Sequence, residues 1–151
     1  MTHDLRIDRR TGSALVGHLI EITPGLDKFY VEQRVSSLLS STRDFGNGYQ
    51  WLYLKGLSFG AQPCGLGLCF SNGNLCEISW SVQLPNAPME GGWPTRAAID
   101  QEIEFVRREL EQQLGCRLEL ACFQWGQVWS GFDENGFLAS NGIRYSIPSG
   151  A

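Results

Sequence analysis

Cysteine and histidine are the residue types in this sequence that could carry nucleophilic or metal chemistry. A zinc site needs ligands at recurring spacings, but four and six residues separate Cys64, Cys69 and Cys76, and neither histidine is near them. The cysteines form an odd set and a chain of this length does not depend on cross-links, so the sequence favours reduced, buried thiols. It predicts no metal and no cofactor. The five cysteines are Cys64, Cys69, Cys76, Cys116 and Cys122.

A catalytic cysteine also needs a base, and His18 is the histidine that falls in a predicted strand. The sequence leaves a spatial pair of a cysteine and a histidine open. Gly65 and Gly67 have the spacing that begins a dinucleotide-binding fingerprint, but Phe70 stands where the third glycine belongs, and no Gly-Lys-Ser/Thr follows. The sequence therefore predicts no catalytic residue.

Acidic and aromatic side chains are the better candidates for a binding role. Acids in turns and on helix surfaces are normally solvated, but they can steer a cationic partner without being buried. The chain has five tryptophans, and an exposed tryptophan is a frequent binding anchor, although most are expected in the core. The predicted partner-binding residues are Trp93, Trp129, Asp133, Glu134, Glu102 and Glu109.

Composition limits the classes of function. The 151 residues, 42% of them hydrophobic, predict a single domain over residues 1–151. The 12 basic and 16 acidic residues give a net charge of -4 without a Lys/Arg cluster, which disfavours nucleic acid and favours a basic protein partner. No apolar run approaches the roughly 20 residues of a membrane span, and the N-terminus lacks the pattern of a secretory signal. We therefore expect no membrane association and a cytoplasmic location.

The first half of the chain is predicted to be mainly strands. Residues 5–8 and 13–22 read as a hairpin of two strands, and apolar spacing predicts a helix from Leu26 to about Ser41. Asn72-Gly73 predicts a tight turn between two further strands. In the second of these, alternation places one set of residues on one face, namely Cys76, Ile78, Trp80, Val82 and Leu84. It places Leu75, Glu77, Ser79, Ser81 and Gln83 on the other face. The other expected strands are 49–54, 64–70 and 75–84.

In the second half, Thr95 is predicted to cap a helix that runs to Leu114 and ends at Gly115. Strands are expected at 116–123, 127–132 and 137–147, with a turn at 133–136. Strand runs joined by turns, with two helices, predict an α+β fold. In this fold two α-helices pack against a mainly antiparallel sheet of about six to eight strands.

Four short motifs carry a resemblance to other proteins. They are Ile7-Asp8-x-x-Thr11-Gly12, the glycine-bounded segment 56–60, the segment Phe-x-Trp-Gly-x-Val-Trp-Ser at 123–130, and Arg144-Tyr145. With these motifs and its order of elements, the chain resembles small bacterial proteins of uncharacterised families. Some of those resemble immunity proteins of contact-dependent or secretion-delivered toxins. The resemblance implies a cytoplasmic, acidic, non-enzymatic inhibitor that occludes a cognate toxin. It assigns no functional residue.

Three functions therefore stand as hypotheses. The first is an immunity-type inhibitor that binds a basic toxin domain through acidic and aromatic surface. The second is a small-molecule binding domain or minor enzyme with a pocket between sheet and helices, where Cys64 or His18 is the reactive group; a deep polar cavity would favour it. The third is a structural or assembly subunit, which a large self-complementary apolar patch would support. The sequence does not determine the oligomeric state.

Overall fold

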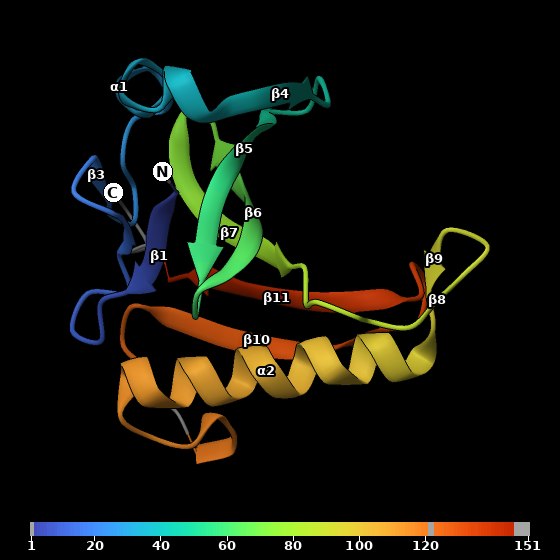
Figure 1. Ribbon diagram of the computed structural model, residues 1–151. Coiled ribbons are helices and arrows are strands. Elements are labelled where there is room, and N and C mark those ends of the chain that lie inside the picture. The colour runs from blue at the N-terminus through green and yellow to red at the C-terminus, as the bar shows by residue number, and fades with distance from the viewer. Residues whose placement is uncertain (1, 121–122, 147–151) are drawn as a thin grey trace.

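The computed structural model describes residues 2–120 and 123–146, which contain two α-helices and eleven strands (Figure 1). The helices are α1 (Lys28–Arg34) and α2 (Arg96–Leu114), with short 3-10 turns η1 (Ser36–Leu38) and η2 (Leu118–Leu120). The strands are β1 (His3–Ile7), β2 (Ala14–Val16), β3 (Ile20–Ile22), β4 (Leu39–Asp44), β5 (Tyr49–Phe59), β6 (Gln62–Ser71), β7 (Asn74–Val82), β8 (Met89–Glu90), β9 (Trp93–Pro94), β10 (Gly126–Asp133) and β11 (Leu138–Tyr145).

Nine of these strands form one sheet in the order β10-β11-β7-β6-β5-β1-β2-β3, with β4 paired to β5 beside β1. Every pairing in it is antiparallel except that of β1 with β5. The α+β prediction is confirmed, but the strand count exceeds the expected six to eight. The predicted strand 13–22 is in fact β2 and β3, because Gly17 adopts a left-handed φ of 53° and reverses the chain between them.

The first helix is much shorter than its apolar spacing predicted. Asp27 caps α1 by accepting a hydrogen bond from the Tyr30 backbone N–H at 3.0 Å, and the helix ends at Arg34. Residues 39–44 then pair with β5 as strand β4. The prediction of helix to Ser41 was wrong because backbone pairing with β5 outweighs a weak helical preference in this short segment.

The β6–β7 hairpin turns at Asn72 and Gly73, whose positive φ values of 50° and 85° confirm the predicted tight turn. The register shifts between Cys69 and Phe70, so that Cys69 pairs with Glu77 while Phe70 pairs with Leu75. Cys76 is therefore the extra residue of a β-bulge. The bulge reverses the alternation, so Leu75 is fully buried and its predicted outward position was wrong.

Helix α2 matches its prediction at both ends. The Thr95 hydroxyl accepts a hydrogen bond from the Ala98 N–H at 3.2 Å, and Gly115 takes a left-handed φ of 71°. The helix lies across β10, β11 and β1 (Figure 1) and buries an apolar stripe against them. The buried residues of this stripe are Ala98, Ile99, Val106, Leu110 and Leu114, whereas Ile103 is half-buried.

The segment after α2 differs from the prediction of a strand at 116–123. Its described part contains η2, and Phe123 forms only an isolated bridge with Gly126; residues 121–122 lie outside the described residues. Gly115 ends α2, and Leu118 is half-buried in η2, so the chain turns at the end of the helix instead of continuing as a strand. Strands β10 and β11 and the turn between them confirm the remaining predictions as far as Tyr145, and Ile147 lies outside the described residues.

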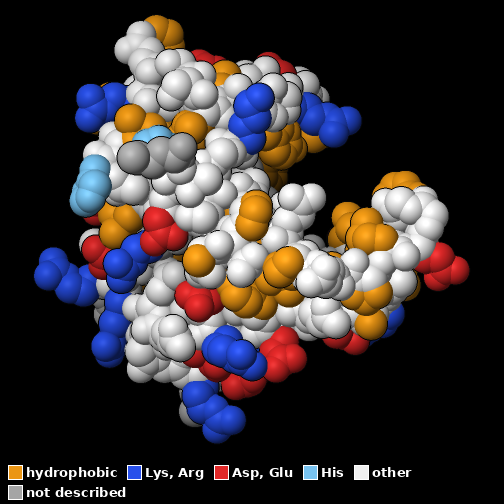
Figure 2. Space-filling view, in the orientation of Figure 1, with side chains coloured by type: hydrophobic (Ala, Val, Ile, Leu, Met, Phe, Trp, Pro, Cys, Tyr) orange, Lys and Arg blue, Asp and Glu red, His pale blue; other side chains and the backbone are white. Residues whose placement is uncertain are grey.

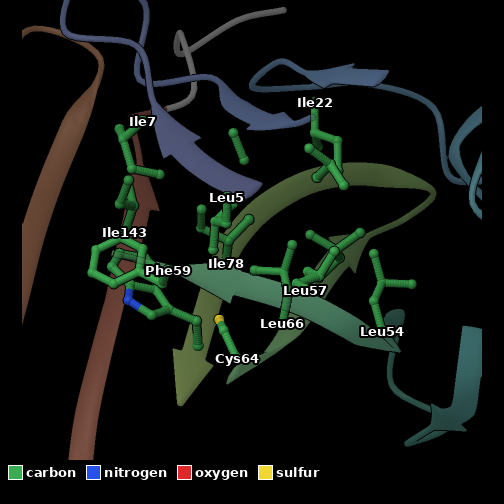
Figure 3. Close-up of a cluster of buried hydrophobic side chains, with 14 of the residues drawn as sticks. Leu5, Ile7, Ile22, Leu54, Leu57, Phe59, Cys64, Leu66, Ile78 and Ile143 are labelled. Atoms are coloured by element: carbon green, nitrogen blue, oxygen red, sulfur yellow. The ribbon is translucent and has the colours of Figure 1, made fainter. Parts of the chain in front are cut away.

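The core lies on the concave side of the sheet (Figure 3). Side chains from β1, β3, β5, β6, β7 and β11 point toward one another there and are buried. We call the opposite sheet face the outer face; by register it carries Tyr53, Gly67, Ser79 and Gly142 in one cross-strand row. The labelled core residues in Figure 3 are Leu5, Ile7, Ile22, Leu54, Leu57, Phe59, Cys64, Leu66, Ile78 and Ile143.

Several motif residues have structural roles. The Tyr145 hydroxyl donates to the Gly12 carbonyl at 2.6 Å, and the Trp125 ring covers Gly12, where an added Cβ would lie 2.3 Å from Cε3. The Trp125 indole N–H donates to the Arg9 carbonyl at 3.1 Å, and Phe123 stacks on Trp125. These contacts join the β1–β2 turn to β10 and β11.

Neither described helix is long and apolar enough to cross a membrane.

Candidate binding groove

An open groove of about 910 Å³ lies between one end of the sheet and the start of α2. Its walls come from β5, β6 and β7 on one side and from residues 84–94 and α2 on the other. Figure 2 shows the hollow that separates a projecting arm from the body of the molecule. Its lining includes Lys55, Cys64, Ser81, Met89 and Glu102.

The projecting arm is the β8–β9 hairpin, which the sequence did not predict. Gly91 and Gly92 turn it with positive φ values of 58° and 83°. Its apolar side chains face solvent, since Met89 is 56% and Trp93 71% exposed. Thr95 closes the base of the arm, because its N–H and hydroxyl both donate to the Pro88 carbonyl, at 3.2 and 2.9 Å. The residue that caps α2 therefore also anchors the arm.

Glu102 provides the acidic group of the groove. Its Oε2 accepts hydrogen bonds from the Val82 backbone N–H at 3.2 Å and from Asn141 Nδ2 at 2.9 Å. Burial raises the pKa of this carboxyl, and the two hydrogen bonds oppose that rise. Oε1 accepts no hydrogen bond from the described residues, which leaves it available to a donor that enters the groove.

Asn141 holds Glu102 in position. It is 1% exposed, and its Nδ2 also donates to the Trp80 carbonyl at 3.1 Å. Its Oδ1 accepts a hydrogen bond from the Ser130 hydroxyl at 2.6 Å, and Arg107 donates to the Ser130 carbonyl at 3.0 Å. These bonds connect α2 to β7, β10 and β11. The carboxylate is therefore held by a fully bonded amide, which fixes its orientation toward the groove.

The β10–β11 turn lies next to the start of α2. The Arg96 guanidinium carbon is 3.7 Å from the centre of the Phe132 ring, and Phe137 packs edge-on against Phe132 at 5.3 Å. Phe137 and Leu138 remain 52% and 43% exposed. A shallower depression of about 340 Å³ on the outer face reaches from this turn to the groove, sharing Gly65 and Ser81 with it. Groove and depression thus form one concave surface.

Four of the six predicted binding residues lie on or beside this surface. Glu102 lines the groove, Trp93 is on the arm, Asp133 lines the adjoining depression, and Glu134 follows it in the exposed turn. Their role in binding stays a prediction. The sequence missed Met89, Phe137, Leu138 and Asn141. The Gly91-Gly92 pair between Met89 and Trp93 was nevertheless a signal for the arm hairpin.

The other two predicted residues have local packing roles. The Trp129 ring lies over Gly142, where an added Cβ would be 2.5 Å from Cζ2, and its N–H donates to the Ser140 hydroxyl at 2.9 Å. Glu109 packs on the β5–β6 turn, where a Cβ on Gly60 would lie 2.7 Å from the carboxyl carbon. Glu109 does not line the groove.

The thiol and imidazole that could have made the groove reactive are not brought together. Burial raises the pKa of Cys64 to about 12, with Glu102 and Asp4 adding to the rise, so this thiol is protonated at neutral pH. His18 is exposed in the β2–β3 turn and does not line the groove. Within residues 2–120 and 123–146, no group of three or more His, Cys, Asp or Glu side chains is placed to hold a metal ion.

The stability of a Glu102→Gln variant relative to wild type is expected to increase with pH. The ordinary pKa of this carboxyl is 4.5, and its pKa in the folded protein is higher, so between these two pH values the native protein binds more protons than the unfolded chain. The stability that Glu102 contributes through this difference is fully present below pH 4.5 and is lost as the pH rises through its pKa in the folded protein. Glutamine does not titrate, and urea unfolding of both proteins from pH 4 to 8 measures the difference. A difference that stays constant with pH would contradict this.

Comparison with protein families, with curated proteins and with solved structures gives no match to this chain. Evidence about its function comes from its own geometry.

Proposed function

We propose that this protein is a non-enzymatic binding protein that receives a protein partner between the arm and the sheet. The observation that carries the proposal is the open groove of about 910 Å³, bordered by a firmly anchored arm with exposed Met89 and Trp93. Apolar side chains held in solvent on a fixed hairpin are typical of binding anchors, because little conformational freedom is lost when they are covered.

Charged side chains around the groove are mostly acidic, although Lys55 also lines it, and this favours a basic partner. Glu90 on the arm and Asp133 and Glu134 in the β10–β11 turn are exposed, and Glu102 offers a carboxylate oxygen inside. Arg96, at the start of α2, is engaged by Asp100 at 3.0 Å and by the Phe132 ring. The chain as a whole carries a net charge of -4. A domain that presents an apolar tip with neighbouring Lys or Arg side chains is the complementary surface.

The specific form of the proposal is an immunity-type inhibitor that neutralises a bacterial toxin by steric occlusion. A basic toxin domain seated in the groove would contact the arm, the sheet and the β10–β11 turn together. The open shape of the groove and the protonated Cys64 thiol favour this reading over a small-molecule enzyme.

The test is co-expression of the full chain with an inactivated form of the product of its neighbouring gene, followed by purification. A one-to-one complex that protects cells from the active neighbour would support the inhibitor proposal. Absence of a complex, or a metabolite that co-purifies in its place, would overturn it. In the second case the groove would be a ligand site.

Reversing the charge of Glu134, in the exposed β10–β11 turn beside the groove, is expected to slow association with that partner. Glu134→Lys should lower the association rate constant about threefold at low salt, with the loss disappearing near 1 M salt, where the screening length falls to about 3 Å. Glu21→Lys on β3 changes net charge equally and is the control; it should have a smaller effect. Stopped-flow association at several salt concentrations measures both. Equal rates for the two variants would remove Glu134 from the interface.

A further inference from the structure

Two cysteines on neighbouring strands are brought side by side by the bulge in β7. Because Cys76 is the extra residue, Cys76 and Glu77 together oppose Cys69 on β6. In such a bulge the two residues and the one that they oppose share a sheet face, here the outer face. The sequence predicted reduced, buried thiols for Cys69 and Cys76, and regular alternation along β7 would have placed Cys76 on the opposite face from Glu77.

The Cys76 thiol reaches the backbone of Cys69. Cys76 Sγ donates to the Cys69 carbonyl at 3.5 Å, and a hydrogen bond between the two side chains contributes to the pKa of each thiol. Glu77 is the registered partner of Cys69, and Cys76 is its neighbour in the bulge. Opposed residues of antiparallel strands have Cα atoms about 4.5–5.5 Å apart, and a disulfide spans Cα atoms about 4.4–6.8 Å apart. Neither Cys64 nor Cys116 has another thiol as a hydrogen-bond partner in the described part of the chain.

We propose that Cys69 and Cys76 form a modification site, a dithiol that oxidises to an intramolecular disulfide across the β6–β7 hairpin. The co-reactant is a small disulfide of the glutathione type. Cys76, the more exposed of the two, attacks one sulfur of the oxidant and releases the first small thiol. Cys69 then attacks Cys76 Sγ, forms the protein disulfide and releases the second small thiol. Two protein thiols lose their protons, and two electrons reduce the oxidant to two thiols.

The surroundings of the pair predict a slow, pH-dependent reaction. Burial raises the pKa of Cys69 to about 12 and also raises that of Cys76. The negative charge of Glu77 raises the pKa of Cys76 further. Arg144, which pairs with Glu77 at 3.0 Å, lowers it, and so does the hydrogen bond with the Cys69 thiol. Because the thiolate is the attacking species, the rate should rise about tenfold for each pH unit below the pKa of Cys76.

The site is separate from the groove, and its existence does not depend on the proposed function. The disulfide would close a ring of eight residues, from 69 to 76, around the hairpin turn. A cross-link of this kind restricts the unfolded chain, so we expect the oxidised protein to unfold at a higher temperature than the reduced protein.

The experiment uses the full Cys64→Ser chain incubated with oxidised glutathione at pH 7, 8 and 9. Free thiols are then alkylated, and the protein is digested with trypsin. Residues 56–96 form one tryptic peptide, in which Cys69 and Cys76 are then the only cysteines. We expect this peptide to lose two hydrogen atoms and resist alkylation, at a rate that rises with pH. Cys69→Ser should instead accumulate a glutathione adduct on Cys76.

Two outcomes would overturn the proposal. One is a persistent glutathione adduct on Cys76 in the presence of Cys69, and the other is full alkylation of both thiols at pH 9. A second measurement needs no substitution at Cys64. Chymotrypsin cleaves wild type after Leu68, Phe70 and Leu75, which separates Cys69 from Cys76. The two fragments should stay joined only in the oxidised, unreduced sample.

Discussion

Replacing Asn141 by leucine is expected to lower the free energy of unfolding by about 3–5 kcal/mol, because it leaves buried groups without partners. The side chains have similar volume, so little of the loss comes from a cavity. Leucine cannot donate to Glu102 or to the Trp80 carbonyl, and it cannot accept from the Ser130 hydroxyl. Urea unfolding at pH 7 measures the change.

Asn47→Leu is the matched control. Asn47 is exposed in the β4–β5 turn and accepts one hydrogen bond, from the Tyr49 N–H at 3.1 Å. Its loss is expected to cost about 1 kcal/mol or less. If Asn141→Leu and Asn47→Leu destabilise the protein equally, the buried network does not hold the sheet and α2 together.

A double-mutant cycle separates the Asn141–Glu102 contact from the burial of Asn141 itself. In a Glu102→Leu background no carboxylate is stranded, so Asn141→Leu should cost at least about 1 kcal/mol less than in wild type. Additive costs would show that Asn141 does not position Glu102.

Trp93→Ala is expected to weaken binding of the partner about 30-fold or more while leaving stability within about 0.5 kcal/mol of wild type. The side chain is 71% exposed on the arm, so its removal exposes no core and creates no cavity. Covering it against a partner would remove a large apolar surface from water. Titration calorimetry with the partner that co-purifies with the chain measures affinity, and thermal unfolding measures stability.

Phe29→Ala is the control for the loss of an exposed aromatic side chain. Phe29 is 66% exposed on α1, which lies far from the arm in the ribbon view (Figure 1). It should leave affinity unchanged. If Phe29→Ala weakens binding as much as Trp93→Ala, the partner does not use the arm as its main anchor. If neither has an effect, the partner binds elsewhere.

Elements with local signals agreed with their sequence predictions. Thr95 and Gly115 mark the ends of α2 because a cap and a left-handed residue satisfy backbone groups within a few residues. Asn72-Gly73 turns the β6–β7 hairpin for a similarly local reason. The helix predicted to Ser41 failed because β4 gains its hydrogen bonds from β5, which an apolar spacing within residues 26–41 cannot reveal.

The candidate site depended on contacts between distant parts of the chain. Trp93, Asp133 and Glu134 were chosen for their residue types. In the structure the Arg96–Phe132 contact joins the start of α2, which follows the arm, to the end of β10, which precedes the turn. No sequence pattern distinguished Asn141, because its role depends on a hydrogen bond to Glu102, which lies 39 residues earlier in the chain. Trp129 and Glu109 were chosen by the same residue-type argument as Trp93 and Glu134. In the structure Trp129 packs over Gly142, and Glu109 packs over Gly60.

By itself, the sequence determined the α+β class, the limits of α2, the turns of the β6–β7 and β10–β11 hairpins and the acidic charge, because capping, turn geometry and composition act over short distances or on the whole chain. Only the tertiary structure decided which acids share a groove, which tryptophans cover glycines, and that Cys69 faces Cys76. These depend on strand order, on a one-residue shift of register and on helix docking, which join residues far apart in the chain.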